Sequence, residues 1–183
     1  MNLGLHLLAN TGQPTSFQRL SKVLAIPSVS QTSRYLEYLE DAYLVLPLPR
    51  FSPSLKQRVT SPNKYDAIDN GLRRHNSPQA NPDLGHRLEN AVFLALRQRG
   101  EALHYASETG LWECDFVTPT DAIQVCYELT PANLVREIAG IVGAIKQAGQ
   151  HTARILTFDQ WDRLVHDGLR IDVQPAWEWL ASQ

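Results

Sequence analysis

Acidic and amide side chains recur along two short β-rich runs, one around Asp115 and one around Gln124. Segment 117–121 between them is turn-like, so the two runs predict a β-hairpin. Side chains alternate across a strand, so Glu113 and Asp115 should share one face. Gln124 and Cys126 should likewise share a face of the second strand. Polar groups inside an apolar sheet cost free energy unless they are satisfied or used, which makes this hairpin the candidate site.

The elements that must position the hairpin follow from apolar periodicity and turn residues. Asp83 is expected to cap a helix over 84–99, and Glu89 lies on that helix. Thr130 and Pro131 predict the start of a second helix. The expected order of the second half is helix, three strands, helix, strand, hairpin and short helix, with these bounds: 84–99, 103–107, the hairpin strands, 130–148, 153–158, the strands flanking 166–168, and 177–180. A strand-helix-strand crossover implies a mixed sheet covered by helices.

The first half has a different pattern. Apolar spacing predicts helices over 2–9, 16–24 and 31–44, the last capped by Ser28 or Ser30. Helix, tight break and helix outline a helix-turn-helix. A strand over 44–48 and a basic loop over 50–64 follow, in the position of a wing.

Nucleic-acid contact is the functional expectation for this half. Residues 1–75 carry nine Lys and Arg against five Asp and Glu, whereas residues 76–183 carry eight against fourteen. Short polar and basic side chains suit phosphate or base-edge contacts with double-stranded DNA. The candidates are Ser30, Gln31, Ser33, Arg34, Arg50, Lys56, Arg58 and Lys64. The alternative is a helix-turn-helix used only for packing or protein docking.

Composition and segment boundaries give the domain organisation. The chain has 183 residues, 43% of them hydrophobic, enough for one or two cores. A polar, proline-containing stretch divides it into 1–75, a linker over 76–83, and 84–183. Cys114 and Cys126 are expected on opposite faces and unpaired, which fits a reducing compartment. The sequence shows no signal peptide and no membrane-length apolar run, so a cytoplasmic protein without a membrane partner is expected.

The order of elements and their acids resembles the PD-(D/E)xK nuclease core. The whole chain resembles the C-terminal region of a family of prokaryotic AAA+ ATPases, in which a winged helix precedes a nuclease-like domain without assigned function. The stretches 28–30, 35–43, 67–73, 85–90, 113–116 and 123–125 carry this resemblance. It implies an α+β fold: a winged helix-turn-helix followed by a restriction-endonuclease-like mixed sheet. The ATPase half is absent, since no GxxxxGK[ST] occurs.

The resemblance places the helix acid at Glu89 and the strand acid at Asp115, both as ligands for Mg²⁺. Glu113, on the same predicted strand face as Asp115, is a further candidate ligand. The third strand departs from the pattern, because Gln124 and Cys126 stand where an acid and a lysine are expected. A neutral amide supplies no charge to a hard cation, and a thiol supplies no fixed positive charge. Glu128 and the helix cations Arg136 and Lys146 are possible replacements for the lost groups.

Three functions remain open from the sequence. The favoured one is a nucleic-acid-associated or regulatory module of an AAA+ ATPase-type protein with a degenerate, inactive nuclease-like core. The second is a metal-dependent DNA nuclease. The third is a protein-protein interaction module that docks on an ATPase domain or subunit. The sequence does not fix the oligomeric state.

Overall fold

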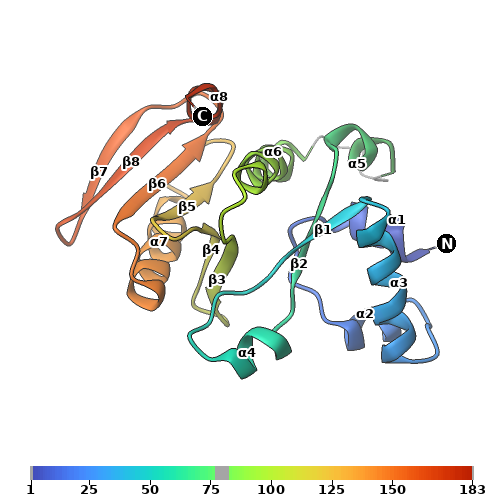
Figure 1. The fold of residues 1–183 in the computed structure, drawn as a ribbon. Helices are drawn as coiled ribbons and strands as arrows, with labels where there is room; N and C mark the ends of the chain where they lie inside the picture. The colour runs from blue at the N-terminus through green and yellow to red at the C-terminus, as the bar shows by residue number, and fades with distance from the viewer. Residues whose placement is uncertain (1, 77–82, 183) are drawn as a thin grey trace.

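The computed structural model describes residues 2–76 and 83–182 of the chain (Figure 1). Residues 2–76 form an N-terminal lobe of helices around a two-stranded antiparallel sheet, in which Val45 of β1 lies opposite Ala67 of β2. Its elements are α1 (Asn2–Ala9), α2 (Phe17–Val23), α3 (Val29–Asp41), β1 (Val45–Leu48), α4 (Leu55–Thr60), β2 (Lys64–Ala67) and α5 (Asn70–Asn76). The two helices expected over 16–24 and 31–44 are therefore present as α2 and α3.

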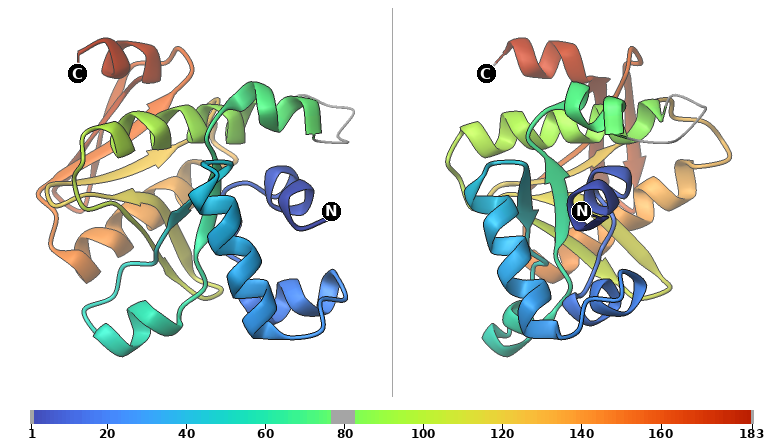
Figure 2. Two further views of the ribbon diagram at one scale, coloured as in Figure 1. Left: turned by 45° about the vertical axis from the view of Figure 1, so that its right-hand side comes forward. Right: turned by 90° about the vertical axis from the view of Figure 1, so that its right-hand side faces the viewer.

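The C-terminal lobe, residues 83–182, is built on a six-stranded mixed sheet with the strand order β3-β4-β5-β6-β8-β7. Its elements are α6 (Leu84–Gln98), β3 (His104–Glu108), β4 (Trp112–Val117), β5 (Asp121–Val125), α7 (Leu134–Ala148), β6 (Thr152–Thr157), β7 (Asp162–His166), β8 (Leu169–Pro175) and α8 (Ala176–Ala181). This is the predicted order, and the parallel β5–β6 pair confirms the crossover through α7. Figure 2 shows α6 above the sheet and α7 below it.

Capping explains where several helices begin. The Ser28 hydroxyl accepts the backbone N–H of Gln31, so α3 begins two residues before the predicted position. The Asp83 carboxylate accepts the N–H of His86 at 3.3 Å and caps α6 as expected. The predicted start of the second long helix at Thr130 is wrong, since α7 begins at Leu134.

Two further predictions need correction or lie outside the description. The stretch 50–64 is not a plain loop: it contains α4, which Ser54 caps, and its last residue belongs to β2. Most of the predicted linker, residues 77–82, lies outside the described residues. Among the described residues, no helix is long and apolar enough to cross a membrane.

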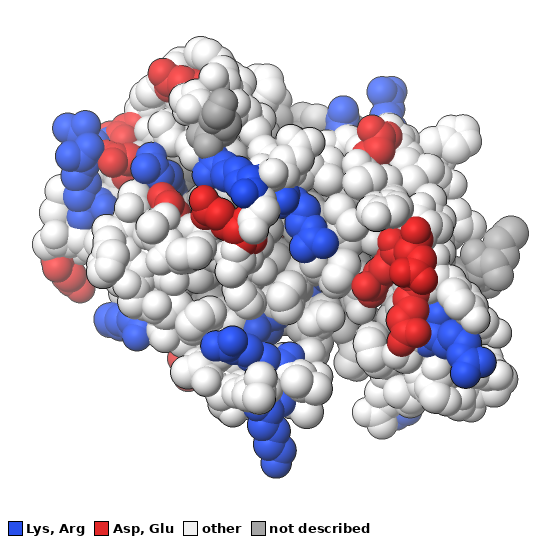
Figure 3. Space-filling model, viewed as in Figure 1, with Lys and Arg blue, Asp and Glu red and all other residues white. Residues whose placement is uncertain are grey.

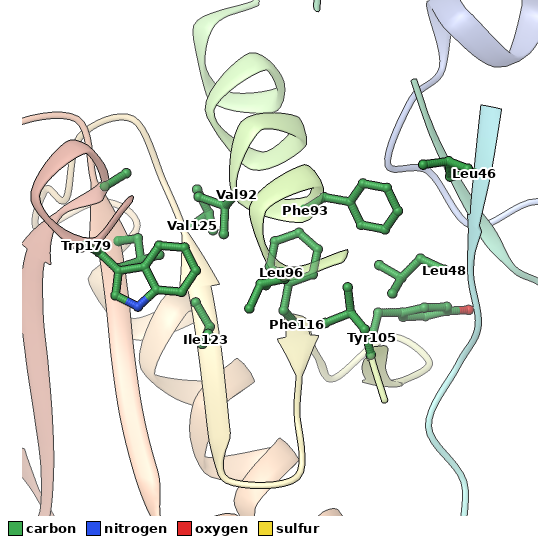
Figure 4. Close-up of a cluster of buried hydrophobic side chains, with 13 residues drawn as sticks. Leu46, Leu48, Val92, Phe93, Leu96, Tyr105, Phe116, Ile123, Val125 and Trp179 are labelled. Atoms are coloured by element: carbon green, nitrogen blue, oxygen red, sulfur yellow. The ribbon is translucent and has the colours of Figure 1, made fainter. Parts of the chain in front are cut away.

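The two lobes share one hydrophobic cluster. Leu46 and Leu48 of β1 pack with Phe93 of α6, Tyr105 of β3 and Phe116 of β4, as Figure 4 shows. Backbone pairing adds to this contact, because the N–H of Phe51 donates to the carbonyl of Tyr105 at 2.7 Å. The N-terminal lobe is thus held against the edge of the large sheet where β3 lies.

A register irregularity in β4 changes which faces its side chains occupy. His104 lies opposite Val117 and Ala106 opposite Cys114, so Asp115 and Phe116 together face one residue of β3. Such a bulge breaks strict alternation. Cys114 consequently belongs to the cluster on the α7 side of the sheet, as does Cys126. The expectation that the two cysteines lie on opposite faces is wrong, although both are buried free thiols as predicted.

Candidate functional site

Three carboxylates from the C-terminal lobe converge on one ammonium group from the N-terminal lobe. The Nζ atom of Lys64, on β2, lies 2.8 Å from Oε1 of Glu113. It lies 3.5 Å from Oε1 of Glu89 on α6 and 3.6 Å from Oδ1 of Asp115 on β4. The predicted acids Glu89, Glu113 and Asp115 are thus brought together, but around a lysine that the sequence assigns to a basic loop.

Lys64 is held in place from several sides. Its side chain is only 1% exposed, and its Nζ lies 5.3 Å from the centroid of the Tyr105 ring. The Tyr105 hydroxyl donates to the carbonyl of Pro62 at 2.6 Å, which fixes the start of β2 against β3. Gly12, at a φ of 77°, brings backbone close to Glu89: a Cβ at this position would lie 3.2 Å from Oε1 of that acid. Backbone as well as side chains therefore packs around the Lys64 ammonium.

Asp115 and Gln124 stabilise the bulged part of the sheet. Oδ2 of Asp115 accepts the backbone N–H of Val125 at 2.9 Å, while its other oxygen faces Lys64. The Gln124 side-chain carbonyl accepts the backbone N–H of Asp115 at 3.2 Å. These two bonds join β4 to β5 beyond the point where their regular pairing ends. Gln124 therefore satisfies backbone here, rather than offering its carbonyl to a ligand.

Helix α7 packs directly on the strand that carries Glu113. A Cβ added at Gly140 would lie 2.1 Å from the backbone oxygen of Glu113, and one at Gly143 would lie 2.2 Å from the Trp112 ring. Since these two glycines are three residues apart, they share one face of the helix. The absence of a Cβ at these two positions lets α7 approach β4 closely and set its position.

Burial and the closeness of like charges raise the pKa values of two acids in this site, Glu89 and Asp115. Burial raises the pKa of Glu89, and the neighbouring charge of Asp115 raises it further. Burial likewise raises the pKa of Asp115, against the lowering effect of Lys64. Burial by itself lowers the pKa of the Lys64 ammonium, but the carboxylates around it, Glu89 first, outweigh burial and raise that pKa. The lysine therefore stays charged while its acids compete for one positive charge.

Asp66, two residues beyond Lys64 on β2, is a functional candidate that sequence reasoning missed. It is 1% exposed, and within the described part of the chain neither of its carboxylate oxygens has a hydrogen-bond partner. Burial raises its pKa to about 7, with Lys64 opposing and Asp115 adding to the rise. We call Lys64, Asp66, Glu89, Glu113 and Asp115 the acid–lysine cluster. One feature of the sequence could have pointed to Asp66: it lies two residues from Lys64, so both charged side chains share one face of a short strand.

The remaining predicted groups have simpler positions. Cys126 is 7% exposed, and burial raises the pKa of its thiol to about 12, so it fills space and is not a reactive thiolate. Arg136 pairs with the buried Glu137 on α7. Lys146 lies along a separate groove beside α7, and Glu128 contributes to the rim of the cleft described next.

A cleft of about 800 Å³ opens beside the acid–lysine cluster, between the lobes. Lys64, Glu89, Glu113 and Asp115 line its floor, and Arg50, His86 and Arg136 are among the other lining residues. Glu113 is the most open of the three acids around Lys64, with 43% of its side chain exposed, against 13% for Glu89 and 12% for Asp115. Contact between the cluster and a ligand in the cleft would therefore begin at Glu113.

The cluster does not fit a divalent cation as it stands. Mg²⁺ and Ca²⁺ need oxygen ligands at about 2.0–2.6 Å, and the space between these carboxylates holds the Lys64 ammonium. Among the residues that the structure describes, no group of three or more His, Cys, Asp or Glu side chains is arranged to hold a metal ion. The expected Mg²⁺ ligands Glu89, Asp115 and Glu113 instead share a lysine.

The predicted nucleic-acid contacts divide into surface and interior groups. Ser30, Gln31 and Arg34 are exposed in the first turns of α3, and Ser33 is half-buried. Lys56 and Arg58 are exposed on α4. Figure 3 shows basic side chains gathered over α4 and acidic ones over α3. Arg50 is half-buried and donates to the Ser107 carbonyl, and Lys64 is buried, so the placement of Lys64 on an exposed basic loop is wrong.

Comparison with known proteins gives relatives without an assigned activity. Residues 2–83 match the sequence model of a domain of unknown function, DUF8612. An uncharacterised protein of Methanocaldococcus jannaschii is 35% identical over 158 residues, covering 79% of this chain and 35% of that protein. An uncharacterised protein of Haemophilus influenzae is 33% identical over 136 residues, covering 68% of this chain and 33% of that protein. The chain thus spans about a third of the length of these curated relatives. No solved structure matches the chain.

Proposed function

We propose that this chain is a nucleic-acid-binding, regulatory module whose nuclease-like core does not cleave. One observation carries the proposal: the Lys64 ammonium lies among Glu89, Glu113 and Asp115, where a nuclease of the resembled type would hold its metal ion. Carboxylates neutralised by a lysine supply neither a Lewis acid nor an activated water. The cleft and the exposed basic residues remain available for binding.

Double-stranded DNA is the proposed ligand of the N-terminal lobe. Arg34 in the first part of α3 and Lys56 and Arg58 on α4 are exposed cations. The acids Glu37, Glu40 and Asp41 lie in the later turns of α3, so phosphate would approach its first turns. This pattern supports a winged-helix role in which α3 and the β1–β2 connection contact the duplex.

Fluorescence anisotropy of a labelled duplex between 50 and 200 mM salt tests binding. We expect Arg34→Ala/Arg58→Ala to weaken binding and to reduce the salt slope by about 1 to 2. Arg163→Ala/Arg170→Ala is the charge-matched control, because both arginines lie on the β7–β8 hairpin, paired with Asp172. Absence of binding at 50 mM salt, or equal losses in both variants, would contradict the proposal.

A metal-dependent nuclease is the second candidate, and one observation favours it. The third strand carries Cys126 where the nuclease pattern has a lysine. Lys64, from the other lobe, supplies a cation beside the acids in its place. Incubation of the wild-type protein with plasmid, linear and single-stranded DNA in Mn²⁺ tests this activity. Cleavage that disappears in Asp115→Asn would establish it, whereas the non-cleaving function predicts no cleavage.

The association with an AAA+ ATPase is also part of the proposal. The relatives are about three times as long as the matched region, which leaves room in them for a further domain. Gel filtration with light scattering, of this chain alone and mixed with an AAA+ ATPase that lacks such a region, tests the association. A complex with the ATPase, together with no duplex binding, would favour a protein-protein interaction module over a nucleic-acid-binding one.

A further inference from the structure

We propose that Lys64 is the built-in cation of the carboxylate site formed by Glu89, Glu113 and Asp115, and that it keeps a divalent ion out. This inference rests on the proposed non-cleaving function and deepens it. It explains how three acids lie together without a metal ion: the N-terminal lobe supplies the cation between them.

Distances and burial carry the first step. Nζ of Lys64 lies within 3.6 Å of all three carboxylates and donates hydrogen bonds into the group. An ion bound to these oxygens at about 2.0–2.6 Å would lie against the ammonium, a like charge. With 1% exposure and backbone packed around it, Lys64 cannot turn out to solvent without movement of β2. Ion and ammonium therefore exclude each other.

Asp66 gives the second, independent observation. Its carboxylate is 1% exposed, belongs to the same strand face as Lys64, and lacks a hydrogen-bond partner among the described residues. Three carboxylates lie within 3.6 Å of Lys64, and Asp66 adds a fourth buried carboxyl nearby, whose pKa both Lys64 and Arg73 lower. Removal of the ammonium would leave the carboxylates that it pairs without their cation, which electrostatically favours a divalent ion.

The cation and its acids come from different lobes, so the packing of the two lobes places the ammonium in the site. Lys64 reaches the site because β1 and β2 pack on α6 and β3 through Leu46 and Leu48. Glu89, Glu113 and Asp115 belong to the C-terminal lobe. The ammonium therefore fills the site through the packing of β1 and β2 against α6 and β3.

Isothermal titration with Mn²⁺ tests the inference on the full chain. Lys64→Met retains most of the buried volume and removes the charge. We expect the wild type to show no stoichiometric Mn²⁺ binding and Lys64→Met to bind one equivalent. At a Mn²⁺ concentration a hundredfold above Kd, the unfolding midpoint of Lys64→Met should rise by roughly 5–11 °C.

The control is Lys64→Met/Asp115→Asn, which keeps the side-chain shape and should lose the Mn²⁺ response. If Lys64→Met unfolds without metal, Mn²⁺-dependent refolding of that variant is the expected result. Stoichiometric binding by the wild type would overturn the inference, as would a folded Lys64→Met that binds no Mn²⁺ or an unfolded Lys64→Met that Mn²⁺ never refolds. Duplex binding is measured separately, so its failure would refute the proposed function and leave this titration decisive.

Discussion

Lys56 and Lys64 belong to one basic stretch of the sequence and have opposite environments in the structure. Lys56 is exposed on α4, whereas Lys64 is buried on β2 among carboxylates. The difference arises because α4 projects from the β1–β2 connection and β2 packs between the lobes (Figure 1). One cation is available to a partner and the other holds the molecule together, so charge counts along a sequence do not distinguish binding from structural lysines.

The largest expected effect is on stability. Lys64→Met, measured by urea unfolding without metal, should lose about 3–5 kcal/mol, since it leaves buried carboxylates uncompensated. Lys56→Met should stay within about 0.5 kcal/mol. Equal losses in the two variants would remove the distinction between the two lysines.

The close approach of α7 to β4 gives the next effect. Gly140→Ala should destabilise the protein by about 2–3 kcal/mol, because its Cβ would lie 2.1 Å from the backbone oxygen of Glu113. Gly85→Ala, on α6, has no atom within 4 Å of the added Cβ and is the matched helical control. A neutral Gly140→Ala variant in thermal unfolding would show that β4 is not held by this contact.

Asp66 should make stability depend on pH. Its folded pKa of about 7 lies above the ordinary value of 3.8. The folded state therefore binds more protons between these values, and this carboxyl lowers stability as pH rises from about 4 to 7. Asp66→Asn should be more stable than the wild type by several kcal/mol at pH 8, about 1.4 kcal/mol for each unit of the pKa rise, and similar to it near pH 4. Chemical denaturation at the two pH values checks this, and a constant difference would contradict it.

The smallest expected effect is on duplex binding, and it tests whether the exposed Lys56 contacts a partner. Lys56→Ala should weaken duplex binding about two- to fivefold at 50 mM salt and reduce the salt slope by about 1. Folded Lys64→Met should keep the wild-type dependence of duplex binding on salt, whether it is measured with Mn²⁺ or without it. An unchanged slope in Lys56→Ala would exclude α4 from the interface.

Much of the fold followed from local pattern, and much of the site did not. Apolar periodicity and the Asp83 cap predicted the order of α6 through α8. The polar face of the predicted hairpin pointed to Asp115, and the family resemblance added Glu89 as its partner. The bulge at Asp115 and the partner of that acid are set by packing between elements far apart in the sequence. Lys64 lies 25 residues from Glu89 along the chain, and no local rule relates a lysine at the start of a short strand to a helix acid.

The central claim is that a lysine, not a metal ion, occupies the carboxylate site. A crystal of the wild-type protein soaked in Mn²⁺ and measured at the manganese absorption edge tests it most directly. We predict no anomalous peak between Glu89, Glu113 and Asp115, with the Lys64 ammonium still bonded to Glu113. An anomalous peak bound by these acids, with Lys64 displaced or sharing the site, would contradict the claim.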